Sequence, residues 1–196
     1  MTKSSLRTAR GFTLIELLLT MAVAVTLTGI AVPLLTATME EIRIAAAARH
    51  VAARIAVARI DAVRRSATVG LRFVATGSDY SSTAYLDTNG NGIRTTDVTA
   101  GVDVMLTPPE RLADNYPGAV FGLLTGIPDI DGGTGNTDGV RIGASRILSV
   151  APNGSATPGT LYMHGRRGQY AVRVFGATGR TRVFQYDSGA GRWISR

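Results

Sequence analysis

Residues able to do acid–base or metal chemistry are scarce in this sequence. Its 196 residues include two histidines, His50 and His164, and no cysteine. A zinc site or a histidine-based triad would therefore depend on carboxylates to complete it, and no serine stands in a G-x-S-x-G context. We predict that the chain is not an enzyme and that its histidines are surface or structurally satisfied residues.

One segment has the spacing of a cation-binding loop. Asp87, Asn89, Asn91 and Gly92 match the first half of D-x-[DN]-x-[DN]-G, in which alternating oxygen atoms wrap a calcium ion and glycine makes the sharp turn. The closing glutamate is missing, because Val98 stands at the twelfth position and Asp97 one residue earlier. The segment is either a weak calcium site or a plain Asn-Gly turn, and we expect no other cofactor.

Arginines form the second candidate site. Arg166 and Arg167 stand in GRRG, Arg180 and Arg182 in GRTR, and Arg192 and Arg196 flank Trp193. Guanidinium groups on exposed turns suit phosphate contacts, and a neighbouring aromatic ring can stack on an unpaired base. The alternative is that these arginines are solvated residues of hairpin turns.

Charge is segregated along the chain, within a formal net charge of +7. Residues 1–76 contain ten Lys/Arg and four Asp/Glu. Residues 77–139 contain two Lys/Arg and nine Asp/Glu, and residues 140–196 contain nine Lys/Arg and one Asp/Glu. This pattern favours internal complementarity between an acidic middle and basic flanks, or a basic surface for a polyanion.

The N-terminus combines basic residues with an apolar segment of membrane-spanning length. Lys3, Arg7 and Arg10 precede a run from Phe12 to Leu35 that is interrupted by one acidic residue, Glu16. A helix of this length crosses roughly 30 Å of hydrocarbon, and the basic side stays cytoplasmic. A carboxylate at membrane depth costs about 2.5–3.5 kcal/mol on insertion scales, so we expect a cation to meet Glu16.

The string Gly11-Phe12-Thr13-Leu14-Ile15-Glu16, preceded by basic residues, resembles the class III signal of type IV pilins and type II secretion pseudopilins. The resemblance implies that a prepilin peptidase cuts between Gly11 and Phe12, that the Phe12 amine is methylated, and that Glu16 pairs with the Phe12 ammonium of a neighbouring subunit. It also implies that Pro33, which would disturb a helix by removing a hydrogen bond, marks a stretch that melts locally in the filament.

The remaining sequence predicts an α+β fold. Ile44, Ala48, Val51, Ile55, Ala58 and Ala62 give one apolar stripe on a helix that continues from the membrane segment. From residue 69 onward, short alternating segments between glycine-rich turns predict an antiparallel meander without further helices. We expect the stretch from Pro128 to Gly139 to be an exposed, mobile loop. The predicted segments are a leader over 1–11, a membrane and assembly helix over 12–35, an amphipathic helix over 36–66 and a β domain over 67–196.

Three further stretches, ARIDAVRRSATVGLRFV, YLDTNGNGIRTTD and GATGRTRVF, resemble segments of the GspH/FimT group of minor pseudopilins. The resemblance implies an inner-membrane protein with one span and a periplasmic C-terminal domain. Its implied partners are other pilins or pseudopilins, the assembly platform and prepilin peptidase, and its implied role is in a type II secretion pseudopilus or a pilus tip. The alternative is a FimT-like pilin for DNA uptake, in which Arg180 and Arg182 contact DNA. Many members carry a terminal cysteine pair that this chain lacks.

Overall fold

The computed structural model describes residues 11–196, apart from the side chains at positions 32–34 and 37. The chain divides into two compact units, which meet between Met39 and Glu40. The first helix, α1 (Leu14–Arg65), contributes to both units. It continues through position 33, so the proline expected to disturb the helix does not end it here.

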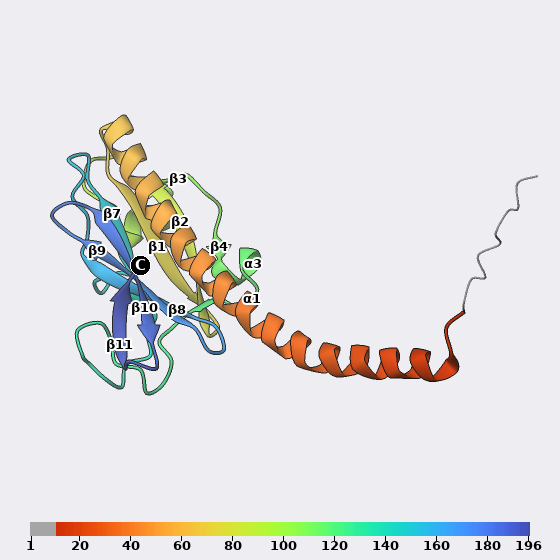
Figure 1. Ribbon diagram of the computed structural model, residues 1–196. Helices are drawn as coiled ribbons and strands as arrows, with labels where there is room; N and C mark the ends of the chain where they lie inside the picture. Colours follow the sequence, from red (N-terminus) through yellow and green to blue (C-terminus); the bar gives the residue numbers. More distant parts are fainter. Residues whose placement is uncertain (1–10) are drawn as a thin grey trace, which may run out of the picture. The chain divides into compact units, whose positions relative to one another are not determined.

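Two antiparallel sheets make up most of the second unit (Figure 1). The first has the order β3-β2-β1-β7, with β4 also paired to β2; its strands are β1 (Val69–Thr76), β2 (Asp79–Leu86), β3 (Val104–Met105), β4 (Glu110–Arg111) and β7 (Ile147–Val150). The second has the order β11-β10-β9-β8-β5, with β6 also paired to β8; its strands are β5 (Val120–Phe121), β6 (Val140–Arg141), β8 (Gly159–His164), β9 (Gln169–Phe175), β10 (Arg180–Asp187) and β11 (Arg192–Ser195). The expected α+β fold with antiparallel sheet is confirmed.

The main core lies between the second half of α1 and the inner faces of both sheets. All six residues of the predicted stripe are buried, and Ile44, Ile55 and Ala62 are fully inaccessible. They share one cluster with Leu71 and Leu148 and with other strand residues from the two sheets. The 3.6-residue period of the stripe therefore predicted the packed face of α1 correctly.

Strand pairing is local in one part of the fold and long-range in another. β8, β9, β10 and β11 follow one another as a meander. In the first sheet, β1 pairs with β2 through a tight hairpin, but its other neighbour is β7, with Val69 opposite Val150. The part of the second sheet from β8 to β11 is therefore a meander as expected, whereas β5 and β6 pair with the later β8 and the first sheet ends with β7, a strand from much later in the chain.

One expectation about the connecting segments is wrong. Short helices occur at α2 (Thr95–Ala100) and α3 (Leu112–Asn115), where we expected no helix. Both are too short to show a periodic apolar pattern in the sequence.

The segment from Pro128 to Gly139, expected to be an exposed, mobile loop, is an irregular loop whose residues 131–137 are exposed and whose first residues pack on the second sheet. Ile130 and the neighbouring Ile127 pack with Tyr162 and Trp193 on the face of the sheet that is turned away from α1. The Trp193 indole N–H also donates a hydrogen bond to the carbonyl oxygen of Pro128 at 2.9 Å. Alternation along β8 produces this arrangement, because Leu161 and Met163 enter the main core while Tyr162 points to the other face.

Candidate functional sites

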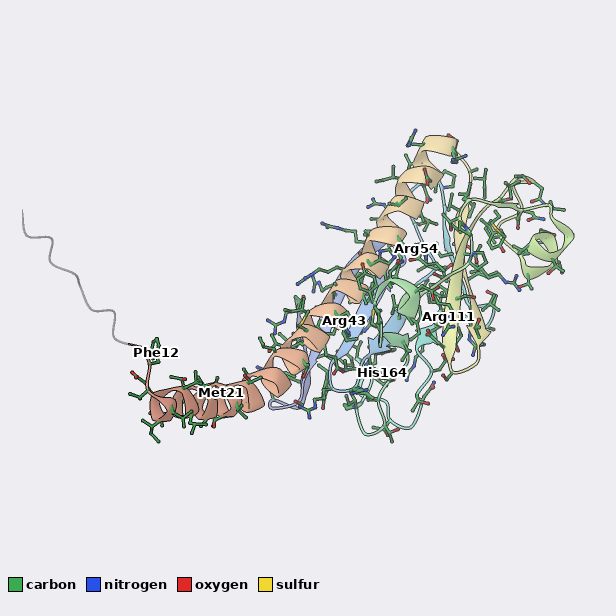
Figure 2. The ribbon with its side chains drawn as sticks, turned by 90° about the vertical axis from the view of Figure 1, so that its right-hand side faces the viewer. Phe12, Met21, Arg43, Arg54, Arg111 and His164 are labelled. Carbon is green, nitrogen blue, oxygen red and sulfur yellow. The ribbon has the colours of Figure 1, made fainter. Side chains whose placement is uncertain are left out.

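The N-terminal part of α1 carries apolar side chains that no described residue of the chain covers. A window from Leu14 to Ala31 has a mean hydropathy of 2.1 and no buried residue, which makes it long and apolar enough to cross a membrane. Phe12, just before the helix, is 83% exposed, and the side chains of this stretch stand out from the ribbon in Figure 2. Lipid or other protein must therefore cover this surface in the cell.

Glu16 lies on this uncovered helix. Its backbone N–H donates a hydrogen bond to the Thr13 hydroxyl at 3.3 Å, and that hydroxyl lies 3.5 Å from the Glu16 carboxylate. Among the described residues, no ion pair involves Glu16. The described residues therefore do not provide the cation that we expect to pair with Glu16. Most of the predicted leader, residues 1–10, lies outside the described residues; Gly11 and Phe12 are described.

The two predicted arginine pairs lie at opposite ends of β9. Arg166 and Arg167 occupy the turn before β9, whereas Arg180 begins β10 after the turn that follows β9. Seven residues of extended strand separate these turns, which corresponds to about 20 Å. The four arginines therefore do not form one cluster, and each pair has different neighbours.

The GRTR pair shares one face of β10. Arg180 and Arg182 are exposed and two residues apart, so their side chains start on the same side of the sheet. Arg182 stands opposite Arg173 in the register, and its guanidinium lies 5.9 Å from the centre of the Phe175 ring. Gly179 before them has φ +60°, and a Cβ there would lie 2.3 Å from the Gly154 carbonyl oxygen. The glycine of GRTR is thus required by a close backbone approach.

A groove beside GRTR brings in two further arginines. Its lining comes from the end of α1 and the start of β10: Ala56, Arg59, Ile60, Val63, Arg64, Gly179, Arg180 and Thr181. Arg59 and Arg64 are not among the candidate residues expected from the sequence. The sequence signal that could have indicated this groove is the apolar pair Ile60 and Val63, which lies off the buried stripe; these residues are 56% and 53% exposed.

The GRRG turn is fixed to the beginning of the second unit. The Arg166 backbone N–H donates a hydrogen bond to the Glu40 carboxylate. A Cβ at Gly165 would come within 2.8 Å of Ile44, so this glycine allows the turn to close on α1. Arg166 and Arg167 are exposed but lie beside an acidic side chain, whereas Arg180 lies beside further arginines.

Both histidines are engaged in contacts within the second unit. His50 Nε2 lies 3.0 Å from Glu110 Oε1, and the other oxygen of Glu110 accepts a hydrogen bond from Arg54 at 2.7 Å. Arg54 also donates to the Ser82 hydroxyl at 2.7 Å. His164 Nδ1 lies 2.8 Å from the carbonyl oxygen of Gly165. The Glu110 cluster ties α1 to β2 and β4.

The Asp87 segment forms a folded loop between β2 and β3. Asp87 is 4% exposed, and its carboxylate accepts hydrogen bonds from the N–H groups of Gly90 at 2.8 Å and Gly92 at 2.7 Å. Asn89 Oδ1 accepts one from the Asn91 N–H at 3.1 Å. In the part of the chain that the structure describes, no three His, Cys, Asp or Glu side chains are arranged to hold a metal ion. The loop thus has the oxygen-rich turn that the motif predicts, but its carboxylates are not arranged together as metal ligands.

Two more aspartates belong to this loop. Asp103 is 3% exposed, and burial, aided by the nearby charges of Asp87 and Asp97, raises the pKa of its carboxyl despite the hydrogen bond from the Arg94 N–H. Hydrogen bonds from Asn91, with smaller ones from Asn89, lower the pKa of Asp97. The loop therefore concentrates three carboxyl groups within 17 residues of sequence, from Asp87 to Asp103.

Comparisons with known proteins match the N-terminal features. Residues 6–32 match the family described as the prokaryotic N-terminal methylation motif. The chain is 38% identical over 84 residues to pilin-like protein PilA1 of Thermus thermophilus. This chain is type IV pilin-like. The PilA1 alignment covers 43% of the chain and 52% of the relative, so it spans about half the length of that protein. No solved structure matches the chain.

Part of the acidic middle of this pilin-like chain is neutralised by its basic flanks. Each carboxylate of the segment from Pro128 to Gly139 pairs with an arginine that follows it: Asp129 with Arg141 at 2.5 Å, Asp131 with Arg173 at 2.8 Å and Asp138 with Arg146 at 2.9 Å. Arg54 from the N-terminal flank pairs with Glu110 in the same way. Four of the nine acidic residues between 77 and 139 thus pair with arginines of the flanks, which supports internal complementarity for that part of the charge pattern.

Asp138 shows how strongly this segment is held. Its carboxylate accepts hydrogen bonds from the Tyr80 hydroxyl at 2.7 Å and from Arg146 at 2.9 Å. Burial alone would raise the pKa of this carboxyl, but these bonds and one from the Val140 N–H hold it below its ordinary value. The carboxylates of this loop are thus used in contacts within the chain.

Proposed function

We propose that this pilin-like chain is a non-enzymatic minor pseudopilin of the GspH/FimT type, a subunit of a type II secretion pseudopilus or of a pilus tip or priming complex. The chain is anchored by residues 12–35 in the inner membrane, with its second unit in the periplasm. Prepilin peptidase removes the leader after Gly11. The observation that supports this role best is the apolar helix, which the described residues leave uncovered and on which Glu16 has no cation partner among those residues.

The assembly step follows from the cost of that carboxylate. In a membrane or a filament core, an unpaired Glu16 is expensive, and a methylated ammonium at Phe12 of a neighbouring subunit offsets the cost only in the correct axial register. The charge thus selects the register in which subunits add, while the apolar helix supplies most of the buried area. The similarity to PilA1, a pilin-like protein, supports an assembly role of this kind.

Replacement of Glu16 tests this proposal. Glu16→Ala in the full-length chain should insert into the membrane at least as well as wild type, because a charge is removed from the apolar span, but it should be lost from complexes with partner subunits. Thr26→Ala is a matched control, since Thr26 is also exposed on this helix and its hydroxyl bonds only to the Ala22 carbonyl oxygen of the same helix. Co-purification from membranes measures incorporation. Recovery of Glu16→Ala in complexes at the wild-type level would contradict the pairing.

A second candidate function, DNA binding for uptake, is favoured by the groove at the end of α1. Arg59 and Arg64 line it with Arg180, next to exposed Ile60 and Val63, which offers cations for phosphates beside apolar surface for sugar or base. Arg182 extends the basic surface along β10. The opposite arginine pair at GRRG lies beside Glu40, which makes it the weaker phosphate site.

Two double variants of equal charge separate these possibilities. In the full-length chain in detergent, Arg180→Ala with Arg182→Ala should weaken DNA binding and lower the slope of log affinity against log salt by about two phosphate contacts. Arg166→Ala with Arg167→Ala removes the same charge at the other end of β9 and should have the smaller effect. Equal losses from both pairs would indicate binding to any basic surface and would reject the groove as a DNA site.

A further inference from the structure

We infer that copies of this chain join through the open edges of their two sheets, with the start of β10 in one copy lying beside β3 in the next. The inference rests on the proposed role as a filament subunit, and it assigns the groove at the end of α1 to a protein contact rather than to DNA. Both edges belong to the second unit, Glu40–Arg196, so the contact is separate from the pairing expected at Glu16.

In the part of the chain that the structure describes, the first half of β10 has a neighbouring strand on one side only. β9 pairs with β10 from Arg180 to Gln185, whereas β11 pairs with it only from Phe184 to Asp187. The Val183 carbonyl oxygen accepts a hydrogen bond from the Arg196 N–H at 3.0 Å, so the backbone polar groups of Val183 point away from β9. Alternation along a strand gives Thr181 the same direction, and its N–H and C=O therefore lie at an open edge beyond the end of β11.

β3 provides a second open edge, because it is the outermost strand of the first sheet. It pairs with β2 through Val104, which stands opposite Leu86. The Leu106 N–H donates to the Ala84 carbonyl oxygen of β2 at 2.8 Å, so the backbone polar groups of Leu106 and Val104 point toward β2. Those of Met105, between them, point away from β2. An edge of this kind is a template on which another strand can pair.

Exposed apolar side chains accompany both edges. Beside the start of β10, the groove is lined by apolar residues of α1, of which Ile60 and Val63 are more than half exposed. On β3 and just before it, three apolar residues are at least 41% exposed: Val102, Val104 and Met105. Contact between the two edges would remove both apolar surfaces from water, which is the main driving force for association.

The two edges carry opposite charge. The groove brings together Arg59, Arg64 and Arg180, and none of the three takes part in an ion pair with another described residue. The loop that leads into β3, residues 87–103, contains three aspartates and one arginine, and its aspartates also lie outside those ion pairs. Asp87 and Asp103 are buried, so they act mainly through their field. Opposite charge favours β10 beside β3 over two copies of the same edge, where like charges would meet.

The proposed contact is heterologous, because each copy contributes a different edge. Such a contact leaves one edge of each kind free at the two ends, so copies can add in an open helical array. With Thr181 opposite Met105, the two residues exchange two backbone hydrogen bonds. A contact this short is weak by itself, but subunits that already lie next to one another in a filament meet at high effective concentration.

Disulfide trapping tests the pairing, and the absence of cysteine from the sequence makes each introduced thiol the only one in its chain. Residues directly opposite one another have Cα atoms about 4.5–5.5 Å apart, a separation that a disulfide spans. Full-length Thr181→Cys and Met105→Cys chains are mixed in detergent and oxidised, and intact mass identifies each dimer. Mixed dimers should outnumber the two symmetric dimers together several-fold, whereas random collision would give equal amounts. Equal amounts, or no dimer, overturn the inference.

Two further variants locate the contact. Val57→Cys replaces Thr181→Cys as the control, since Val57 is also exposed on α1 but does not line the groove, and it should give no excess of mixed dimers with Met105→Cys. Ile60→Glu, added to the Thr181→Cys chain, puts a charge of the same sign as the β3 loop into the groove and should lower the yield of mixed dimers several-fold. An unchanged yield with Ile60→Glu, or an equal excess with Val57→Cys, overturns the assignment.

The outcome can be separated from that of the proposed function. The trapped contact does not involve Glu16, so Glu16→Ala in both cysteine chains should leave the mixed dimers in place. If mixed dimers do not form while co-purification with partner subunits still depends on Glu16, the edge contact is wrong and the assembly role stands. If they do not form while DNA binding depends on Arg180 and Arg182, the groove is a nucleic-acid site and the inference is overturned.

Discussion

A matched pair of substitutions on α1 tests the packing of the second unit. Ile55 is fully buried against the sheets, whereas Ile60, little more than one helical turn later, is 56% exposed. Ile55→Ala removes three carbons from a closed core, worth about 2.4 kcal/mol at 0.8 kcal/mol for each buried CH₂, and leaves a cavity that brings the total to about 3–4 kcal/mol. Ile60→Ala changes a surface position and should cost less than about 0.5 kcal/mol.

The assay is thermal unfolding of the full-length chain, followed by Trp193 fluorescence. For a unit the size of Glu40–Arg196, 1 kcal/mol shifts the midpoint by about 2–4 °C, so Ile55→Ala should lower it by about 6–16 °C and Ile60→Ala by less than about 2 °C. The difference depends only on which face of α1 meets the sheets. Equal shifts, or a larger one for Ile60→Ala, would refute the packing described here.

Three other perturbations follow from specific contacts. Gly139→Ala should abolish or severely weaken folding, because its Cβ would lie 2.2 Å from the Gly122 backbone nitrogen. Soluble yield and near-ultraviolet circular dichroism measure this loss of folded protein, and a wild-type spectrum would contradict it. Glu110→Ala should cost about 1.5–3 kcal/mol in denaturant unfolding, since Arg54 would lose its charged partner; a loss below about 0.5 kcal/mol would refute that expectation. Burial raises the pKa of Asp129 and of Asp138, but hydrogen bonds and a neighbouring arginine outweigh it, so both pKa values are lowered in the folded chain. The two ionised carboxylates therefore stabilise the fold above the unfolded-state pKa of about 3.9. This contribution should disappear as pH falls through the folded-state values, so acid unfolding of Asp138→Asn should depend less on pH over that range; the same dependence as wild type would argue against it.

The sequence predicted the features that repeat along the chain. The six-residue stripe of α1 could be read because a helix samples the same face every three to four residues, and the strands of the meander could be read from alternation and glycine turns. The separation of acidic and basic segments likewise predicted internal pairing, now seen in Arg54 with Glu110 and in the three arginines that hold residues 129–138.

Features that depend on distant residues could not be read in this way. The pairing of β1 with β7 leaves no local pattern, and neither does the fixing of the Asp129 segment, which looks flexible because it is rich in glycine. Arg59 and Arg64 join Arg180 only because the turn after β9 reaches the end of α1.

The late position of β7 and of the meander determines when this chain can fold. As the chain is synthesised from its N-terminus, the apolar stripe of α1 and the inner face of β1 are made long before Val150 of β7 and Val172 of β9, which cover them. Contacts between residues so far apart in sequence make folding slow, and the incomplete chain exposes apolar surface in the meantime. A nascent chain therefore exposes this apolar surface until β9 has been made, and a truncation before β9 would leave α1 without the second sheet.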